Sequence, residues 1–407
     1  MNNFVIKIRE VPKHWFFIAL VLTGFGLLTL YSISYHSETS LLTSRFIKQI
    51  FWLGGGFLIF LVTFSIPRRI IHKYSYLAVA VVFIMLFLPY VTGKIAGTYR
   101  WIQLSGFTIQ PSELLKWLII IALARYLSDH NLQMDKFRST LLPIIFVLIP
   151  TAIVAKQPDL GSAIILFAPT IPLLYWAGAR PLHIFLVIAP VISVVTAFNL
   201  YTFSIWILAV GVVLYLSKSG IKIGLINFFL NVFIGLFTPF LWNQLQPYQK
   251  ERVLVLIDLS RDPYGAGYQL IQSITAIGSG GFLGKGFGNG TQTHLKFLPE
   301  QETDFIFSVI GEEFGFVIVV LILILFAVLI WKIIKTSFVA DERFSSLVLI
   351  GIATILLSHV FVNVGMTVNL LPVKGLPLPF LSYGGSFLIS CFAMLGLAMN
   401  MTVEDIE

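Results

Sequence analysis

The sequence predicts an all-α protein, a polytopic bundle of transmembrane helices with one large extracytoplasmic loop. Hydrophobic residues make up 57% of its 407 residues and charged residues only 11%, whereas soluble domains are about 25% charged. Apolar stretches recur from Trp15 to Met401 without an intervening soluble block. We therefore expect residues 1–407 to form a single integral membrane domain.

Each apolar run is a candidate membrane helix, because about 20 apolar residues span the hydrocarbon core of a bilayer. The first run follows the basic residues Lys7, Arg9 and Lys13 and is too long for a signal peptide, so we interpret it as a retained helix. The runs predict about 10–12 crossings. They cover residues 15–34, 50–66, 74–91, 113–128, 141–155, 161–177, 182–200, 202–217, 223–242, 304–331, 345–370 and 380–401.

The basic residues indicate the orientation of these helices, since short loops rich in Lys and Arg stay in the cytoplasm. With the N-terminus inside, the predicted cytoplasmic connections contain Arg68, Lys136 and Arg180. This arrangement requires an odd number of crossings between residues 182 and 242. It places both termini in the cytoplasm and the long segment 243–303 outside.

Several functional classes are disfavoured by the composition. The net charge of +8 is scattered between hydrophobic segments and forms no basic stripe, which argues against a nucleic acid partner. Cys391 is the only cysteine, so an internal disulfide is impossible and a cysteine-based metal site is not expected. The Gly284-Lys285 pair lacks the flanking residues of a phosphate-binding loop, which argues against a nucleotide site.

Two charged residues lie at the start of the fourth apolar run, where each ionisable group is a candidate for function. Glu113 and Lys116 are three residues apart and so share one helix face near the outer surface. They form either a salt bridge that neutralises both charges or an anion-facing lysine with its orienting carboxylate. The spacing leaves both interpretations open.

Further candidates lie in two short external connections. Arg100 can donate a forked pair of hydrogen bonds to phosphate, and Trp101 can stack on a ring, although Trp101 is also typical of an interface anchor. Lys156 and Asp159 lie on a tight turn, where Asp159 either contributes to a binding site or caps the turn.

Asp258 and Asp262 are the carboxylates of the long external segment that are best placed to accept a proton. They precede a glycine-rich stretch, while Glu302 and Asp304 lie beside the start of the next apolar run. The alternatives are solvated turn aspartates for the first pair and a favourable charge at a helix N-terminus for Asp304. Aromatic and aliphatic residues recur throughout the segment, so we expect it to fold onto the helix bundle.

Five sequence blocks resemble the SEDS family, whose members act in shape, elongation, division and sporulation. They occur in the order found in that family and are spread across the chain. The LPLP run at 376–379 favours the elongation members over the division members. The blocks are QPSELLK at 110–116, KQPDLG at 156–161, RDPYGAGY at 261–268, LPEQETDFIF at 298–307 and GLPLPFLSYGGS at 375–386.

The resemblance implies a peptidoglycan glycosyltransferase that polymerises lipid II at the outer face of the bacterial cytoplasmic membrane, during cell elongation and the maintenance of cell shape. It assigns the general base to Asp262. A divalent cation, Mg²⁺ or Mn²⁺, is compatible with that chemistry, and no other cofactor is expected. The substrate-binding set, which includes the basic residues expected to stabilise the lipid diphosphate, comprises Arg45, Arg100, Trp101, Glu113, Lys116, Lys156, Asp159 and Lys374.

The same resemblance implies a partner protein, and two alternative functions remain open. Family members work with a class B penicillin-binding protein, a transpeptidase, so we expect such a partner among the membrane lipids around the helices. The alternatives are a flippase that moves lipid II across the bilayer and a scaffold without catalytic activity. The family pattern has one crossing where residues 182–242 carry three apolar runs, which predicts two extra helices in this chain.

Overall fold

The computed structural model describes residues 11–35, 44–93, 97–104, 107–129, 132–217, 220–256, 258–262, 265–295 and 297–403. These residues form helices and one antiparallel pair of short strands, β1 (Ile102–Leu104) and β2 (Phe107–Ile109), in which Gln103 pairs with Thr108. The fold is therefore all-α in character, as the composition predicts. The terminal segments 1–10 and 404–407, which the sequence predicts to be cytoplasmic, lie outside the described residues.

The described residues contain seven helices that are long and apolar enough to cross a membrane. They are α2 (Lys13–Tyr35), α3 (Arg45–Ser65), the α4–α5 pair (Arg68–Met85 and Leu88–Thr92), α7 (Phe137–Lys156), α12 (Ile221–Gln244), α16 (Ile306–Val339) and α17 (Arg343–Thr367). Shorter helices occupy the other apolar runs and confirm the polytopic architecture. These are α6 (Pro111–Leu127), α8 (Leu160–Phe167) with α9 (Thr170–Trp176), α10 (Pro181–Thr196), α11 (Leu200–Leu216) and α18 (Gly385–Asn400).

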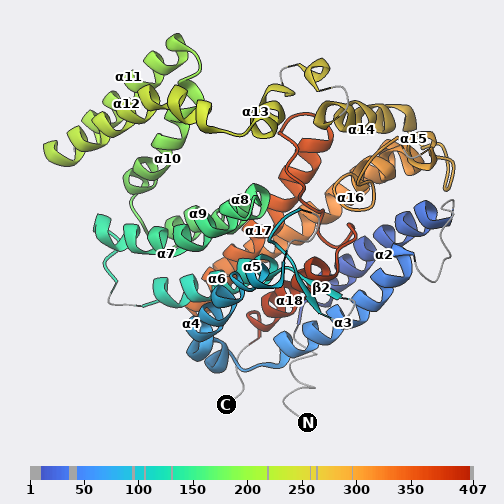
Figure 1. Cartoon of the computed structure of the whole chain (residues 1–407). Coiled ribbons are helices and arrows are strands. Elements are labelled where there is room, and N and C mark those ends of the chain that lie inside the picture. The colour runs from blue at the N-terminus through green and yellow to red at the C-terminus, as the bar shows by residue number, and fades with distance from the viewer. Residues whose placement is uncertain are drawn as a thin grey trace.

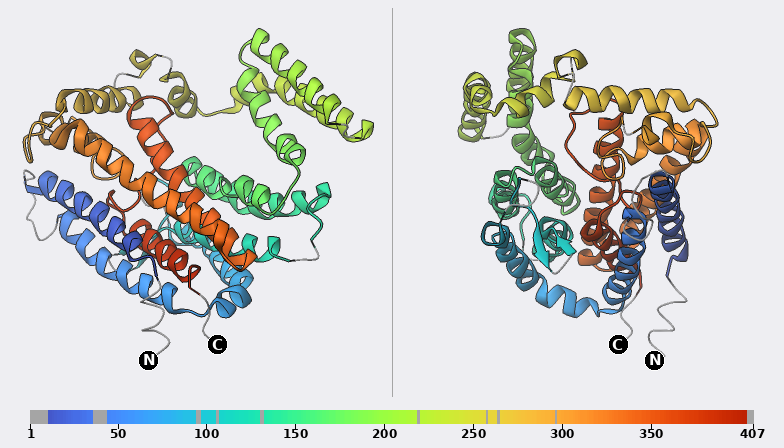
Figure 2. Two further views of the ribbon diagram at one scale, coloured as in Figure 1. Left: turned by 180° about the vertical axis from the view of Figure 1, so that it is seen from behind. Right: turned by 45° about the vertical axis from the view of Figure 1, so that its right-hand side comes forward.

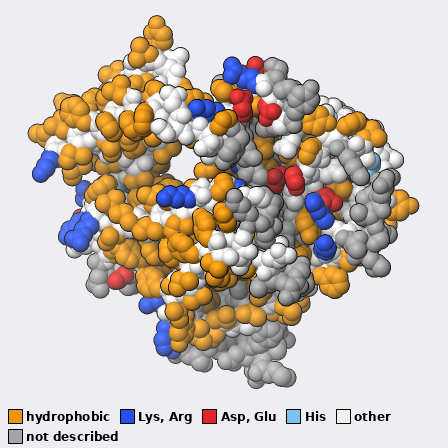
Figure 3. Space-filling view, in the orientation of Figure 1, with side chains coloured by type: hydrophobic (Ala, Val, Ile, Leu, Met, Phe, Trp, Pro, Cys, Tyr) orange, Lys and Arg blue, Asp and Glu red, His pale blue; other side chains and the backbone are white. Residues whose placement is uncertain are grey.

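The surface of the bundle is largely apolar. Large hydrophobic side chains are exposed along several helices, for example Val91 at 85% and Phe51 at 74%. Figure 3 shows hydrophobic side chains spread over one face, with charged groups gathered in a few places. Such a surface suits contact with lipid rather than with water.

α17 lies at the centre of the bundle (Figure 1). Protein buries 67% of its most apolar stretch, against 22–50% in the other six long spans. α18 packs along α3, where a side chain at Gly396 would lie 2.5 Å from the Phe60 carbonyl oxygen. Small residues permit this close approach between helices in a membrane. These central helices form the base against which the polar loops fold.

α10, α11 and α12 form a three-helix lobe that stands beside the main bundle (Figure 2). Its hydrophobic core includes Leu186 on α10 and Val210 on α11. A polar chain joins its helices, since Ser193 Oγ donates to Asn231 Oδ1 at 2.7 Å and accepts from Trp206 Nε1 at 2.9 Å. Three helices match the three apolar runs of this region. That two of them are additions to the family pattern stays a prediction.

The segment after α12 folds onto the bundle, as its composition predicts. It contains α13 (Pro247–Leu254), the 3₁₀ turn η2 (Leu259–Arg261), α14 (Ala266–Gly280) and α15 (Thr291–His294). α16 is interrupted at Gly315, whose φ of +77° favours glycine. Near this break, Phe316 N–H donates to the Gly281 carbonyl at 2.9 Å, and the Glu312 carbonyl accepts from Lys285 N–H at 2.9 Å. The glycine-rich turn thus completes the hydrogen bonding of an interrupted membrane helix.

Candidate active site

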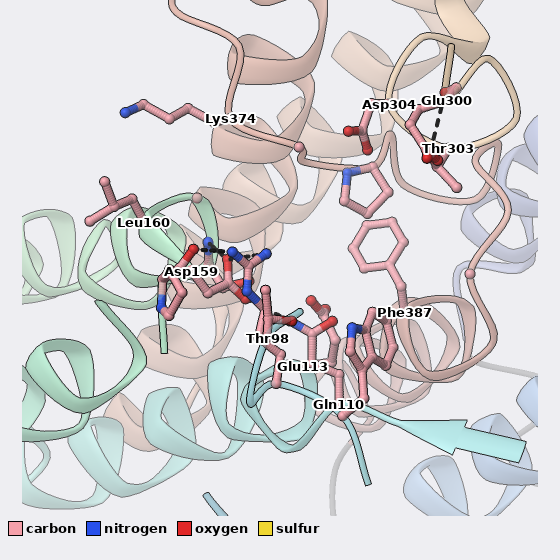
Figure 4. Close-up of a pocket in the computed structure, with 18 of the residues that line it drawn as sticks. Thr98, Gln110, Glu113, Asp159, Leu160, Glu300, Thr303, Asp304, Lys374 and Phe387 are labelled. Carbon is pink, nitrogen blue, oxygen red and sulfur yellow. Dashed lines mark hydrogen bonds and ion pairs between the residues drawn. The ribbon is translucent and has the colours of Figure 1, made fainter. Parts of the chain in front are cut away.

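A cavity of about 490 Å³, lined by both polar and apolar groups, lies among the segments that connect the helices. Its walls come from the residues before β1, the start of α6, the α7–α8 connection, the α12–α13 corner, the loop before α16 and the segment that leads into α18 (Figure 4). A group of charged side chains gathered from distant segments is typical of a binding site rather than of a membrane core. The described charged residues in its walls are Glu113, Asp159, Glu300, Asp304, Arg100 and Lys374.

Arg100 is fixed against the α7–α8 connection. Its Nε donates to the Gln157 carbonyl at 3.1 Å, a second guanidinium nitrogen donates to the Pro158 carbonyl, and Nη1 lies 4.0 Å from Asp159 Oδ1. The side chain lines the cavity and remains 29% exposed, and its neighbour Trp101 lines the cavity as well. A guanidinium held in this way presents a fixed positive charge to an anion such as phosphate.

Asp159 serves as the N-cap of α8, one of the two roles that the sequence allowed. Its Oδ1 accepts from the Ser162 N–H at 3.1 Å, and its Oδ2 accepts from Gln110 Nε2 at 2.7 Å. The side chain lines the cavity but is only 6% exposed. Because both carboxylate oxygens already accept hydrogen bonds, Asp159 chiefly orders the wall that carries Arg100.

The structure pairs Glu113 with Lys116 and directs only Glu113 towards the cavity. Lys116 Nζ donates to Glu113 Oε1 at 2.8 Å, which confirms the salt-bridge interpretation. Glu113 lines the cavity, whereas Lys116 is not among the described lining residues. The Phe387 ring, itself part of the wall, has its centroid 5.6 Å from Lys116 Nζ. A direct contact between Lys116 and an anion stays a prediction.

Asp304 lines the cavity from the loop that precedes α16 (Figure 4). Its carboxylate lies against Gly375, where an added Cβ would be 3.2 Å from Asp304 Oδ2. The Asp304 carbonyl accepts from Asn363 Nδ2 at 2.9 Å, and the same amide donates to the Leu376 carbonyl at 2.7 Å. Asn363 on α17 therefore ties the Asp304 loop to the segment that carries Lys374.

Arg45, at the start of α3, supports the cavity from outside its described lining. It forms an ion pair with Glu302, and its guanidinium lies 5.6 Å from the ring centroid of Tyr383, which lines the cavity. Burial raises the pKa of Glu302 above its usual value, and the positive charge of Arg45 opposes that rise. Burial likewise raises the pKa of Tyr383. Arg45 thus contacts the wall rather than the cavity interior.

Asp262 and Lys156 are not among the described residues that line the cavity. Asp262 lies between η2 and α14, where its carbonyl accepts from the Gly265 N–H at 3.4 Å and the Tyr268 N–H at 3.2 Å. Its carboxylate packs against Gly265. These contacts correspond to a turn-forming aspartate, the alternative that the sequence left open. Lys156 is the exposed last residue of α7.

Asp304 lines the cavity, although sequence reasoning gave it no catalytic role. A signal was available, because Asp304 belongs to the LPEQETDFIF block and lies at the start of a membrane helix, where ionisable groups are candidates for function. The sequence could not separate Asp304 from Asp262, since it does not tell which of the two aspartates lines the same cavity as Arg100.

The charged lining also bears on a divalent cation. Among the described residues, no group of three or more His, Cys, Asp or Glu side chains is arranged to hold a metal ion. Glu300 and Asp304 nevertheless supply carboxylate oxygens to the cavity, and Mg²⁺ often binds through one or two carboxylates together with substrate phosphates. The residues therefore fit a cation shared with a bound diphosphate better than a cation held by protein groups alone.

Comparison with known sequences identifies relatives over nearly the whole chain. The FtsW/RodA/SpoVE family model, described as "Cell cycle protein", matches residues 13–207 and 187–406. The chain is 33% identical over 357 residues to the peptidoglycan glycosyltransferase MrdB of Escherichia coli (strain K12), covering 87% of this chain and 84% of that protein. It is 31% identical over 414 residues to the probable peptidoglycan glycosyltransferase FtsW of Wigglesworthia glossinidia brevipalpis, covering 99% and 97%.

Solved structures share the fold. A chain from a structure described as the structural coordination of polymerization and crosslinking by a peptidoglycan synthase complex aligns with a TM-score of 0.71 and 25% identity, covering 96% of both chains. The rod shape determining protein RodA of Thermus thermophilus aligns with a TM-score of 0.62 and 23% identity, again over 96% of both chains. With a family model that matches almost every described segment, the chain belongs to the FtsW/RodA/SpoVE family, the SEDS proteins.

Proposed function

We propose that the protein is a peptidoglycan glycosyltransferase that polymerises lipid II into glycan strands. The observation that carries this proposal is the presence of Asp304, Arg100, Lys374 and Trp101 in one cavity, contributed by three separate parts of the chain. The names of the relatives support it, since MrdB and FtsW are both called peptidoglycan glycosyltransferases.

The reaction requires a base near the attacking hydroxyl and positive charge near the leaving group. A sugar hydroxyl of one substrate attacks the anomeric carbon of the other, its proton passes to Asp304, and the bond from the anomeric carbon to the diphosphate oxygen breaks. Arg100 and Lys374 stabilise the negative charge that develops on the departing diphosphate. Trp101 offers an aromatic face to a sugar ring.

The cavity favours Asp304 over Asp262 as the base. Asp304 shares the cavity with Arg100, whereas Asp262 accepts hydrogen bonds through its carbonyl within the turn before α14. Asp262 is not among the described residues that line the cavity. A catalytic role for Asp262 therefore stays a prediction from the sequence, and substitution of each aspartate separates the two.

A divalent cation fits this scheme as a component shared with the substrate. Glu300 is the carboxylate that would hold it together with the diphosphate, because Asp304 is assigned to the proton. When bound, such a cation would neutralise charge on the leaving group. The positive charges of Arg100 and Lys374 would also offset negative charge on the leaving group.

We also propose that the cavity faces away from the cytoplasm and that the protein acts in cell elongation with a class B penicillin-binding protein. The orientation is supported by the basic residues of the predicted cytoplasmic connections. Elongation is supported by the LPLP run at 376–379. The partner is supported by the fold match to a chain of a complex described as coordinating polymerization and crosslinking.

A lipid II flippase is the main rival, since it also needs polar groups in a membrane. It would need a cavity that opens alternately to each side and would need no base. The test gives purified protein, together with its transpeptidase partner, labelled lipid II in vesicles. Glycan polymer on a gel is expected. Movement of labelled lipid between leaflets without polymer would favour transport. The absence of both polymer and lipid movement in an intact complex would favour a scaffold.

A further inference from the structure

A buried chain of contacts links the cavity to α17. Lys116 Nζ, which donates to Glu113, also lies 3.2 Å from His359 Nε2, and His359 Nδ1 lies 3.2 Å from the Pro377 carbonyl oxygen. His359 is only 1% exposed. A lysine ammonium group can only donate, so His359 Nε2 accepts and the ring proton resides on Nδ1, where it donates to Pro377. These contacts hold the imidazole in one tautomer and one orientation.

Phe387 lies against Lys116 and His359, the two members of this series of contacts that do not line the cavity. Its ring centroid lies 4.9 Å from that of His359 and 5.6 Å from Lys116 Nζ. Phe387 and Glu113 both line the cavity (Figure 4). Of the three linked groups, Glu113 is the one whose side chain lines the cavity. The contacts that connect His359 to the cavity therefore run through Lys116 and Glu113.

Glu113 carries a hydrogen-bond acceptor that the described residues leave unused. Its Oε1 accepts from Lys116, whereas its Oε2 is buried and has no partner among the described residues. An unsatisfied buried carboxylate oxygen is costly, and a donor brought by a ligand would satisfy it. Because a carboxylate repels phosphate, the complementary ligand group is a hydroxyl or an amide N–H rather than the diphosphate.

We propose that His359 is a positioning residue for substrate binding. Through Lys116, it holds Glu113 so that Oε2 accepts a hydrogen bond from a hydroxyl or amide N–H in the sugar and peptide part of the substrate. The identity of that substrate rests on the proposed function. His359 lies 243 positions from Lys116, so only the fold brings them together.

Three substitutions at His359 test the two contacts of the imidazole one by one and together. His359→Phe keeps an aromatic ring but removes both contacts. His359→Asn retains a donor for Pro377 without an acceptor near Lys116, and His359→Gln places a carbonyl oxygen near the position of Nε2. His183→Phe is the matched control, because His183 is a second buried histidine, 8% exposed, whose Nδ1 lies 3.3 Å from Thr140 Oγ1 in another part of the bundle.

The experiment measures the dissociation constant of fluorescent lipid II for each purified full-length variant, together with KM and kcat for polymerisation with the partner. His359→Phe and His359→Asn are expected to raise Kd and KM about tenfold or more, as for the loss of a hydrogen bond to a charged group, with kcat little changed. His359→Gln should stay within about threefold of the unmodified protein. His183→Phe should leave both constants unchanged.

A double variant tests the proposed route of action. In a Glu113→Gln background, His359→Phe should change Kd by less than about twofold, because its effect is transmitted through Glu113. The proposal would be overturned if the double variant raised Kd by the product of the two single effects. It would also be overturned if His359→Phe and His359→Asn both had the Kd of the unmodified protein.

If thermal melting shows that His359→Phe does not fold, the Kd of His359→Asn decides the test. Absence of polymer from the unmodified protein would count against the glycosyltransferase function, while the Kd values would still decide the role of His359.

Discussion

Lys116 and Glu113 form an ion pair 2.8 Å long, in which the two side chains are only 2% and 4% exposed. Removing two charges from water costs several kcal/mol per ion, roughly offset by their attraction only when the geometry and hydrogen bonding are favourable. The pair as a whole therefore contributes little net stability, whereas either partner alone would be an uncompensated charge.

This pairing predicts an asymmetric response to substitution. Lys116→Met should destabilise the protein by about 3–5 kcal/mol, because Glu113 is left buried without its cation. The double variant Glu113→Gln/Lys116→Met removes both charges and should recover most of that loss, while polymerisation stays low because the Glu113 carboxylate is absent. Denaturant unfolding in detergent measures both variants. A double variant no more stable than Lys116→Met would contradict this account of the pair.

Gly161, at the start of α8, packs against the segment that carries Lys374. A Cβ at Gly161 would lie 2.8 Å from the Lys374 carbonyl oxygen, so this backbone has to shift in Gly161→Ala. We expect polymerisation to fall by up to about a hundredfold, because small displacements of binding groups are costly to catalysis. Gly24→Ala on α2 is the control, since an added Cβ there meets no atom within 4 Å. Equal losses in the two variants would point to a general effect of helical glycines.

The carboxylates of the cavity predict a dependence on divalent cations. Chelation with EDTA should suppress polymerisation, and added Mg²⁺ or Mn²⁺ should restore it. Glu300→Gln should raise the cation concentration needed for half-maximal rate, because one ligand oxygen loses its charge. An unchanged rate after complete chelation would remove the cation from the scheme.

The helices could be predicted because a chain in lipid must satisfy its backbone hydrogen bonds internally, and each apolar run does so as a helix. Arg100, Trp101, Glu113 and Lys374 were predicted as site residues and line the cavity. The residue types of Arg100, Trp101 and Glu113 and their places in or beside an external connection indicated this, whereas Lys374 was implied by the resemblance to the SEDS family.

Two features of the site depend on contacts between distant segments and could not be predicted from the sequence. Lys116 and Glu113 lie on the same helix face, yet Phe387 on α18 lies against Lys116, and of the pair only Glu113 is among the described residues that line the cavity. Asp304 is brought to the cavity by a loop that Asn363 on α17 holds. Neither contact leaves a local pattern in the sequence.

The assignment of the base is tested most directly by comparing Asp304→Asn with Asp262→Asn in polymerisation of labelled lipid II by the purified complex. Both substitutions remove a charge and preserve side-chain size, so they differ only in place. Asp304→Asn should lower the rate by at least about a hundredfold, as expected for loss of a general base, while Asp262→Asn retains most of the activity. Polymer formation that survives Asp304→Asn and disappears in Asp262→Asn would contradict the placement of the reaction in this cavity.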